Sequence, residues 1–317
     1  MTGACGFIGQ NLVAELLKQG ADVIALDLPT ANWSIIPKSV RRVPADILDK
    51  KSLVGVFDTV NIVYHLAART DLGGKKLRDY EVNFEGTKNV FIEAAKKSSV
   101  ERFVFYSTQL VVGLFNEKRF IDENEPYRTN TVYGQSKIEG EKVVKALSNE
   151  YGVNYTIIRP TSVYGPAGGA PYKDFFKAIK SGRYFHVGRA DNLVSMVYVK
   201  NLIDLTILAS LHKSAKNKVY YGNDFHPYTM RDFAETAASY YKIQITSLPY
   251  ALVLLISYIG GILKAVGLNP PIYPFRLKNI MMNYCYDIQN TLAIGYDPKY
   301  NLELGVRETL DWYESRK

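Results

Sequence analysis

The chain is poor in residues that crosslink a protein or bind a metal. It has two cysteines and four scattered histidines among its 317 residues. Cys5 and Cys285 lie far apart in the sequence, so they suggest neither a disulfide framework nor a cluster of metal ligands. We therefore predict no metal site. Such sparing use of cysteine is typical of proteins of the reducing cytoplasm, where we expect this one to reside.

Long apolar runs are also scarce. Residues 250–263 are strongly apolar, but they are fewer than the roughly 20 residues that a transmembrane helix needs. Pro249 suits a helix start, and the helix that follows would be apolar on nearly every face. We expect it to be buried, or to close over an apolar substrate or a dimer partner. The alternative is association with a membrane surface.

The chain has no internal repeat and no charged tail, although its formal net charge is +8. Such a charge is compatible with an anionic substrate such as a nucleotide diphosphate, or with attraction to an anionic membrane. No motif for nucleic acid binding is present, so we expect no nucleic acid partner. The length suits one Rossmann-type domain with a smaller substrate lobe.

The chain does have a glycine-rich turn at its start. Gly3, Gly6 and Gly9 recur at every third position, and an amphipathic run with helical spacing follows. The free N–H groups and the dipole of a helix N-terminus favour a pyrophosphate at such a turn. Residues 21–27 read as a strand that ends in Asp27, about twenty positions after the glycines. Its carboxylate would accept both adenosine ribose hydroxyls and repel a 2′-phosphate, which favours NAD over NADP.

A second motif is the pair Tyr133 and Lys137. Residues 131–151 have helical periodicity, so the two side chains lie one turn apart on the same face. A free tyrosine has a pKa of roughly 10, and a neighbouring ammonium with a positive nicotinamide ring would lower it. We therefore predict Tyr133 as a general base. The same spacing at Tyr313 and Lys317 lacks this context and is read as chance.

The order of elements predicts a doubly wound parallel sheet, because apolar strands alternate with amphipathic helices over residues 61–66, 79–97, 102–106, 131–151 and 155–159. We assign residues 1–160 to an NAD-binding Rossmann domain, with 193–211 packing back on it. Residues 161–317 would mainly form the substrate lobe. Active sites in such sheets lie at the carboxyl ends of strands, where Asp27, Ala67, Thr108 and Thr161 fall.

Together these residues resemble the extended branch of the short-chain dehydrogenase/reductase family, which includes nucleotide-sugar epimerases and dehydratases and 3β-hydroxysteroid dehydrogenases. The resemblance covers nearly the whole chain, through residues 2–9, Asp27, Asp46, 65–68, 82–87, Tyr133, Lys137, 159–166 and 295–298. It implies an NAD-dependent enzyme. It also implies a homodimer built from two helices per subunit, here 79–97 and 131–151.

The resemblance also implies roles for single residues. Thr108 would hydrogen-bond the reacting oxygen, with Ser107 as the fallback, and Tyr133 and Lys137 would complete the catalytic set. Lys137 would also hold the nicotinamide ribose, and Asp46 the adenine. The implied cofactor-binding residues are Gly3, Gly6, Phe7, Ile8, Gly9, Asp27, Asp46, Ile47, Leu66, Ala67, Ala68, Asn83, Ser107, Tyr133, Lys137, Pro160 and Val163.

One element of that family is missing from the sequence. Its members normally have a strand of about five apolar residues before Thr-Gly, at the centre of the sheet, whereas Met1 stands directly before Thr2. Losing a central strand would leave buried N–H and C=O groups unpaired, at roughly 1–3 kcal/mol each. We therefore expect either a natural chain that starts further upstream or a truncated, less stable one.

The residues after Thr108 narrow the reaction. Related 4,6-dehydratases and decarboxylases place carboxylates there, but this chain has Gln109, Leu110 and Val111. With no acid or base beyond Tyr133, an elimination has no proton carrier. Oxidation, reduction, and oxidation followed by re-reduction on the opposite face remain.

The substrate is less determined. Nucleotide-sugar enzymes commonly have an Asn and an Arg for the diphosphate where this chain has Ser162 and Val194, and valine cannot replace an arginine clamp. Arg189 or Lys173 would have to substitute from nearby loops. The candidate substrate contacts are Arg69, Thr108, Gln109, Ser162, Arg189 and Tyr198.

Three interpretations therefore stay open. A nucleotide-sugar epimerase or dehydrogenase comes first, because sugar enzymes are the more numerous in the family. A 3β-hydroxysteroid or sterol-type dehydrogenase for an apolar alcohol comes second, since the diphosphate clamp is absent. A non-catalytic NAD-binding protein comes last, because such a chain would be free to lose Thr108, Tyr133 or Lys137, and all three are present.

Overall fold

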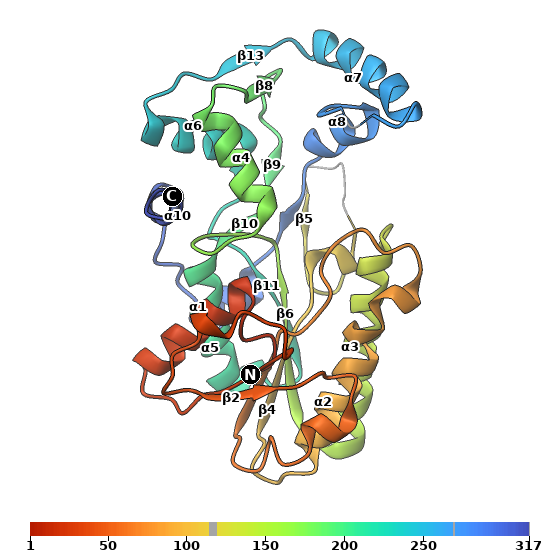
Figure 1. Ribbon diagram of the computed structural model, residues 1–317, viewed down its shortest axis with the longest axis vertical. Coiled ribbons are helices and arrows are strands. Elements are labelled where there is room, and N and C mark those ends of the chain that lie inside the picture. Colours follow the sequence, from red (N-terminus) through yellow and green to blue (C-terminus); the bar gives the residue numbers. More distant parts are fainter. Residues whose placement is uncertain (114–118, 269, 317) are drawn as a thin grey trace.

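The computed structural model describes residues 1–113, 119–268 and 270–316. A parallel sheet with helices on both faces forms one part of the molecule, and a smaller lobe follows it (Figure 1). The predicted α/β fold class is confirmed.

The sheet has two halves. One has the order β11-β6-β4-β3 and the other pairs β1 with β2, and every pairing is parallel. The pairing of β11, which follows the first strands of the lobe in the sequence, with β6 of the sheet was not predicted. The strand bounds are β1 (Ile24–Asp27), β2 (Arg41–Pro44), β3 (Ile62–His65), β4 (Arg102–Tyr106), β6 (Asn154–Pro160) and β11 (Lys218–Gly222).

Thr2 joins the two halves. It forms parallel bridges to Leu26 of β1 and His65 of β3. Its N–H donates to the carbonyl of Tyr64 over 2.9 Å, and the N–H of Leu26 donates to the carbonyl of Met1 over 2.8 Å. Met1 and Thr2 thus lie between β1 and β3, which gives the order β2-β1-Thr2-β3-β4-β6-β11.

Alternating side chains of the strands face two helical layers. Val104 and Tyr106 of β4 belong to the apolar cluster beneath α1 and α5, whereas Phe103 and Phe105 belong to the cluster beneath α2 and α3. Of the residues 193–211 that we expected to pack back on the Rossmann domain, α5 contacts β4 and β6. Residues 193–194 and 196–198 instead pair with strands of the lobe. The helix bounds are α1 (Phe7–Lys18), α2 (Glu85–Ala95), α3 (Val132–Tyr151) and α5 (Val199–Leu211).

The helix expected over 79–97 is broken. A 3₁₀ helix, η3 (Leu77–Asn83), ends at Asn83, and α2 begins at Glu85. Phe84 between them has φ −127° and ψ −47°. Asn83 is fully buried, and its side-chain amide bonds both the N–H and the carbonyl of Arg69. These bonds fix the orientation of Asn83, which explains why the chain turns there instead of continuing one helix.

The lobe consists of short strand pairs and helices. The pairs are β7 (Ser162–Tyr164) with β10 (Met196–Tyr198), β8 (Phe185–Val187) with β13 (Thr246–Leu248), β9 (Leu193–Val194) with β12 (Tyr228–Thr229), and β5 (Phe120–Ile121) with β14 (Cys285–Tyr286). The helices are α4 (Ala170–Lys180), α6 (Met230–Tyr241), α7 (Tyr250–Ala265), α8 (Pro274–Ile280), α9 (Gln289–Leu292) and α10 (Leu302–Glu314). Short 3₁₀ helices are η1 (Trp33–Ile35), η2 (Lys50–Leu53), η4 (Gln109–Val111) and η5 (Lys213–Ala215).

The apolar helix α7 is not buried within the described chain, so that part of the prediction is wrong. It buries only Val253, Ser257 and Gly260, a narrow stripe at helical spacing. Leu255 and Ile262 on its other side are 61% and 69% exposed. In the part of the chain that the structure describes, no helix combines the length and the apolar character needed to cross a bilayer.

Candidate active site

A cavity of about 720 Å³ runs along the carboxyl ends of the strands. It collects most of the residues predicted for a cofactor site, although these come from segments far apart in the sequence. They are Gly3, Gly6, Phe7, Ile8, Gly9, Asp27, Asp46, Ile47, Leu66, Ala67, Ala68, Ser107, Tyr133, Lys137, Pro160 and Val163; Arg69 and Thr108 line it too.

The glycine turn brings backbone to the cavity wall. A Cβ on Gly9 would lie 2.1 Å from the carbonyl oxygen of Gly3, and one on Gly3 would lie 2.7 Å from the nitrogen of Ala67. Gly3 also has φ +69°. Since no side chain fits at Gly3 or Gly9, α1 presents its first N–H groups, behind the N-cap Gly6, to the cavity.

Asp27 is fixed at the end of β1. Its Oδ2 accepts the N–H of Cys5 over 2.8 Å, and its Oδ1 accepts the N–H of Leu28 over 2.8 Å. Burial and the Asp27 carboxylate raise the pKa of the Cys5 thiol to about 11, so the thiol stays neutral beside the carboxylate. Asp46 follows β2, and the segment is held because Asn89 donates to the carbonyl of Ile47 over 2.9 Å.

Tyr133 and Lys137 lie one turn apart at the start of α3. Thr131 caps this helix by accepting the N–H of Gly134 over 3.0 Å. Both side chains line the cavity, and Thr108 also lines it, close enough to Tyr133 to influence the pKa of the tyrosine. The structure therefore places Thr108, rather than Ser107, against the tyrosine.

The electrostatics of the pair differ from the prediction. Burial raises the pKa of Tyr133 to about 12, and the nearby Thr108 side chain opposes that rise. Burial lowers the pKa of Lys137 to about 7, against the pull of the Glu141 carboxylate. The Lys137 Nζ lies 4.3 Å from the centroid of the Phe105 ring. In the protein alone, therefore, Lys137 does not bring the pKa of Tyr133 below its ordinary value.

The Ser107 hydroxyl is already engaged by a buried carboxylate that the sequence analysis missed. It donates to Glu141 Oε1 over 2.6 Å, while Arg159 Nε and Nη2 reach the two carboxylate oxygens over 2.9 Å each. Tyr127 donates to Glu141 Oε2 over 2.8 Å. Glu141 lies four residues after Lys137 on a helix, and that spacing is the signal that would have found it.

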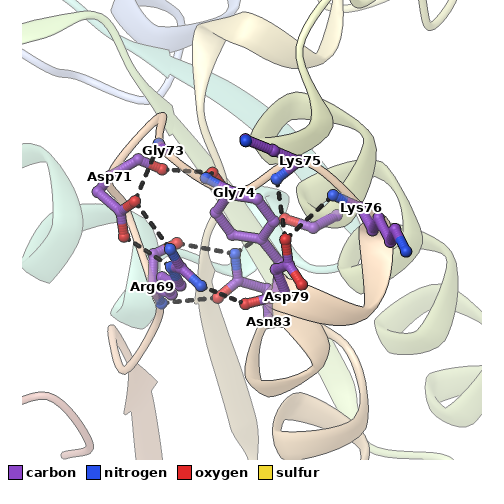
Figure 2. Close-up of polar contacts among 10 residues, drawn as sticks. Arg69, Asp71, Gly73, Gly74, Lys75, Lys76, Asp79 and Asn83 are labelled. Carbon is purple, nitrogen blue, oxygen red and sulfur yellow. Dashed lines mark hydrogen bonds and ion pairs between the residues drawn. The ribbon is translucent and has the colours of Figure 1, made fainter.

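Asn83 does not line the cavity but builds the loop beside it. Its side chain accepts the N–H of Arg69 over 2.8 Å and donates to the carbonyl of Arg69 over 2.9 Å and to the hydroxyl of Ser136 over 2.8 Å. Figure 2 shows the Arg69 guanidinium turned toward Asp71 and the backbone of Asp79. A large part of its hydrogen-bonding capacity is thus used within the loop.

The other predicted substrate contacts also lie outside the cavity lining. Tyr198 is fully buried and its hydroxyl donates to Glu308. Ser162 lies close enough to the Tyr172 and Tyr284 hydroxyls to lower the pKa of each against the effect of burial. The backbone carbonyl of Arg189 accepts from Arg231 over 2.8 Å. Gln109 is buried beside Thr108, and its Oε1 has no hydrogen-bond partner among the described residues.

A buried hydrogen-bonded chain lies beneath the site. Thr2 Oγ1 is 2.7 Å from His65 Nδ1, and His65 Nε2 is 2.9 Å from Thr87 Oγ1. The pKa of His65 is lowered to about 3, mainly by burial and to a smaller extent by the positive charges of Lys137 and the N-terminal amino group. His65 is therefore neutral. The N–H of Ala67, in the cavity wall, donates to the same Thr2 hydroxyl over 3.2 Å.

Thr161, expected at the active-site end of a strand, lines the cavity; the lining residues that sequence reasoning missed are Cys5, Leu26, Leu28, Ala31, Asn32, Ala45, Thr70, Val82 and Tyr106. Most of them adjoin a predicted site residue in the sequence, and that adjacency is the signal that would have found them. Among the described residues, no group of three or more His, Cys, Asp or Glu is placed to hold a metal.

Residues 1–221 match the model of the NAD dependent epimerase/dehydratase family. The chain belongs to this family. It is an NAD-dependent enzyme of the extended short-chain dehydrogenase/reductase type, as the motifs predicted.

Relatives with different substrates align over nearly the whole chain. A 3-beta-hydroxysteroid dehydrogenase of Mycolicibacterium neoaurum is 27% identical, with 99% of this chain and 90% of the relative covered. An N-acetyl-alpha-D-glucosaminyl-diphospho-ditrans,octacis-undecaprenol 4-epimerase of Escherichia coli O157:H7 is 29% identical, with 98% and 94% covered.

Solved structures share the fold. The UDP-glucose 4-epimerase of Thermotoga maritima, solved with UDP-glucose, has a TM-score of 0.79 at 22% identity and covers 99% of this chain and 97% of its own. That of Thermus thermophilus, solved with NAD, has a TM-score of 0.77 at 23% identity and covers 100% and 98%.

The residues present fit NAD. The side-chain-free turn of Gly3 and Gly9 admits a pyrophosphate against backbone N–H groups, and Asp27 lies at the end of the neighbouring strand for the adenosine ribose. Because the cavity extends past the ends of β4 and β6 to Tyr133, one elongated ligand would reach from Asp27 to the tyrosine.

Proposed function

We propose that this enzyme oxidises a secondary alcohol of a nucleotide sugar, as an epimerase or dehydrogenase, with Tyr133 as the general base. The observation that carries the proposal is that Thr108, Tyr133 and Lys137 line one cavity, with Thr108 close enough to Tyr133 to influence its pKa and Lys137 one helical turn away. Thr108 would donate to the reacting oxygen while the Tyr133 oxygen takes the hydroxyl proton.

The raised pKa of Tyr133 requires a positive charge beside it during turnover. Bound NAD supplies a positive ring and the hydride acceptor. Lys137 adds to this, because its ammonium form favours the phenolate form of Tyr133, and a phenolate in turn holds the proton on Lys137. The depressed pKa of Lys137, about 7, then rises once Tyr133 ionises.

The lining carboxylates argue against an elimination. Among the described residues that line the cavity, only Asp27 and Asp46 carry a carboxylate, and these follow β1 and β2, on the far side of Thr2 from Tyr133. No carboxylate or histidine accompanies Tyr133 and Lys137 at their end of the cavity among those lining residues. These residues support transfer of a hydride from the substrate to NAD, with or without return of the hydride to the opposite face of the oxidised carbon.

The sugar substrate is supported by what the relatives act on. The Escherichia coli relative is named as an epimerase of a sugar diphosphate carried on undecaprenol, and two fold neighbours are UDP-glucose 4-epimerases. A second candidate is an apolar alcohol such as a 3β-hydroxysterol. The cavity lining favours it, because Arg69 is the only arginine among the described residues that line the cavity, and Asp71 already pairs with Arg69 over 2.7 Å. Val194, in the place of the clamp, is buried.

A panel of three probes separates these substrates. The NAD-loaded enzyme is mixed with UDP-glucose, with N-acetylglucosaminyl-diphosphoundecaprenol or with a 3β-hydroxysterol in detergent. We expect an epimeric sugar, or reduced nicotinamide, with one of the sugar probes. Reduced nicotinamide with the sterol alone would move the assignment to the apolar alcohol, and NAD binding without turnover of any probe would contradict the proposal.

We also propose a homodimer that uses α2 and α3, which lie side by side on one face of the sheet (Figure 1). Sedimentation velocity at micromolar concentration measures the mass directly. A monomer at that concentration would contradict this part of the proposal.

A further inference from the structure

The lobe ends in an apolar surface that the reaction does not use. We call it the α7–α8 face: Leu255, Tyr258, Ile259 and Ile262 of α7, Val266 just after it, and Phe275 of α8, each more than half exposed. Exposed apolar residues elsewhere, such as Val54 and Leu211, are scattered singly. A cluster of this size on one pair of helices indicates a surface that contacts another apolar phase.

The α7–α8 face is rigidly built. A Cβ on Gly260 would lie 1.9 Å from the carbonyl oxygen of Ile272, so α7 packs against the segment before α8 with no space between them. Lys264 Nζ lies 3.5 Å from the centroid of the Tyr273 ring. The two helices therefore present one surface, at the end of the molecule opposite β2 and α2 (Figure 1).

The segment that forms this face carries charges of one sign. Residues 236–286 contain no Asp or Glu, but they contain Lys242, Lys264, Arg276 and Lys278. These four cations account for half of the formal net charge of +8. None of the ion pairs formed among the described residues includes Lys264, Arg276 or Lys278.

We propose that the α7–α8 face docks the enzyme on the surface of an anionic lipid bilayer. Its apolar side chains would enter the boundary between headgroups and acyl chains, and the three cations would remain at the level of the phosphates. Tyr258 suits this boundary, because its ring is apolar and its hydroxyl polar. The helix would lie in the plane of the membrane, since α7 has only 16 residues.

A second copy of the chain fits this face less well. A closed two-fold dimer would set the same patch against itself and bring Lys264, Arg276 and Lys278 of both copies together with no acid between them. Anionic headgroups instead neutralise each cation, and an anionic membrane surface attracts a polybasic patch. The charge pattern therefore selects the lipid surface.

Vesicle flotation of the full chain tests this without any turnover, so its outcome is independent of the proposed reaction. Vesicles of phosphatidylcholine alone are compared with vesicles that also contain phosphatidylglycerol. We expect binding to the anionic vesicles that is at least tenfold stronger and weakens with salt. The double variant Leu255→Glu/Ile262→Glu should lose at least tenfold in binding to the anionic vesicles.

The matched control is Val54→Glu/Leu211→Glu, at sites that are 71% and 66% exposed and outside the α7–α8 face. It should bind vesicles as the wild type does, and the thermal unfolding of all variants should show that each folds. Lys264→Gln/Arg276→Gln/Lys278→Gln should lose the preference for anionic vesicles.

Three results would overturn the proposal. The first is that the wild type floats with neither kind of vesicle. The second is that the control variant Val54→Glu/Leu211→Glu loses as much binding as Leu255→Glu/Ile262→Glu does. The third is a dimer in solution that Leu255→Glu/Ile262→Glu dissociates while the wild type ignores vesicles. That result would assign the face to a second copy.

Discussion

Glu141 organises the buried part of the site through four hydrogen bonds. Its carboxylate accepts two from Arg159, one from Ser107 and one from Tyr127, and both Glu141 and Arg159 are buried. The strand end that delivers Ser107 and Thr108 is thereby tied to the helix that carries Tyr133 and Lys137. A positioning function follows, because Glu141 is not among the residues that line the cavity.

Glu141→Gln should therefore destabilise the protein strongly. Removing the charge leaves Arg159 buried without its ionic partner, and breaking such a pair costs about 3–5 kcal/mol. Urea unfolding followed by circular dichroism measures the change. The matched control is Glu139→Gln in the same helix, whose partner Lys142 is exposed; it should change the unfolding free energy by less than about 1 kcal/mol. Equal losses in both variants would contradict this account of Glu141.

Single residues also show where sequence reasoning stops. The motif residues Tyr133, Lys137 and Asp27 were found because their spacing is local. Tyr198 was named as a substrate contact, but its hydroxyl donates to Glu308, which lies 110 positions away in the chain. Such a partner cannot be read from spacing, because it depends on how the lobe folds.

Among the elements, those with strong periodicity were predicted well and those with tertiary partners were not. Helix α3 and strands β4 and β6 lie within a residue or two of the predicted ranges. The break at Phe84 escaped prediction, since it follows from the long-range bonds of Asn83. The exposure of α7 was predicted only as the alternative to burial, because an apolar sequence of this length suits a buried helix and an interfacial helix equally.

The turn before α1 depends on the absence of side chains. Gly9→Ala would set a Cβ 2.1 Å from the carbonyl oxygen of Gly3 and 2.9 Å from that of Ala4. Because both obstacles are backbone, the turn must shift, and we expect the affinity for NAD to fall at least tenfold. Isothermal titration of NAD into the protein measures this.

Gly169→Ala is the matched control for that change. Gly169 has φ −74°, and the nearest atom to a Cβ there would be 3.9 Å away. The NAD affinity of this variant should stay within about twofold of the wild type. An unchanged affinity in Gly9→Ala would mean that the turn does not approach the cofactor.

At the scale of the whole molecule, Asp224 connects the sheet to the lobe. It follows β11, and its carboxylate accepts the N–H of Tyr198 over 3.1 Å and the amide of Asn201 over 2.7 Å, with the hydroxyls of Tyr164 and Tyr228 on its other oxygen. Burial raises the pKa of Asp224 from 3.8 to about 7, against these hydrogen bonds.

This raised pKa predicts a pH dependence of stability. Between pH 4 and 7 the folded state keeps a proton on Asp224 that the unfolded state releases, so stability falls as pH rises through this window, by up to about 1.4 kcal/mol per pH unit. Asp224→Asn removes this contribution. Its unfolding free energy relative to the wild type, from urea unfolding at several pH values, should therefore rise from pH 4 to 7. A difference that stays constant with pH would show that Asp224 is ionised throughout.

The most direct test of the central claim compares Tyr133→Phe with Tyr313→Phe in the NAD-loaded enzyme. Tyr313 repeats the spacing to a lysine, but its hydroxyl donates to the carbonyl of Gly168 over 3.1 Å and it does not line the cavity. With whichever of the three probes turns over, we expect Tyr133→Phe to lose at least 100-fold in kcat with NAD affinity within about threefold of the wild type, and Tyr313→Phe to keep its kcat. Equal kcat in Tyr133→Phe and the wild type would contradict the assignment of Tyr133 as the general base.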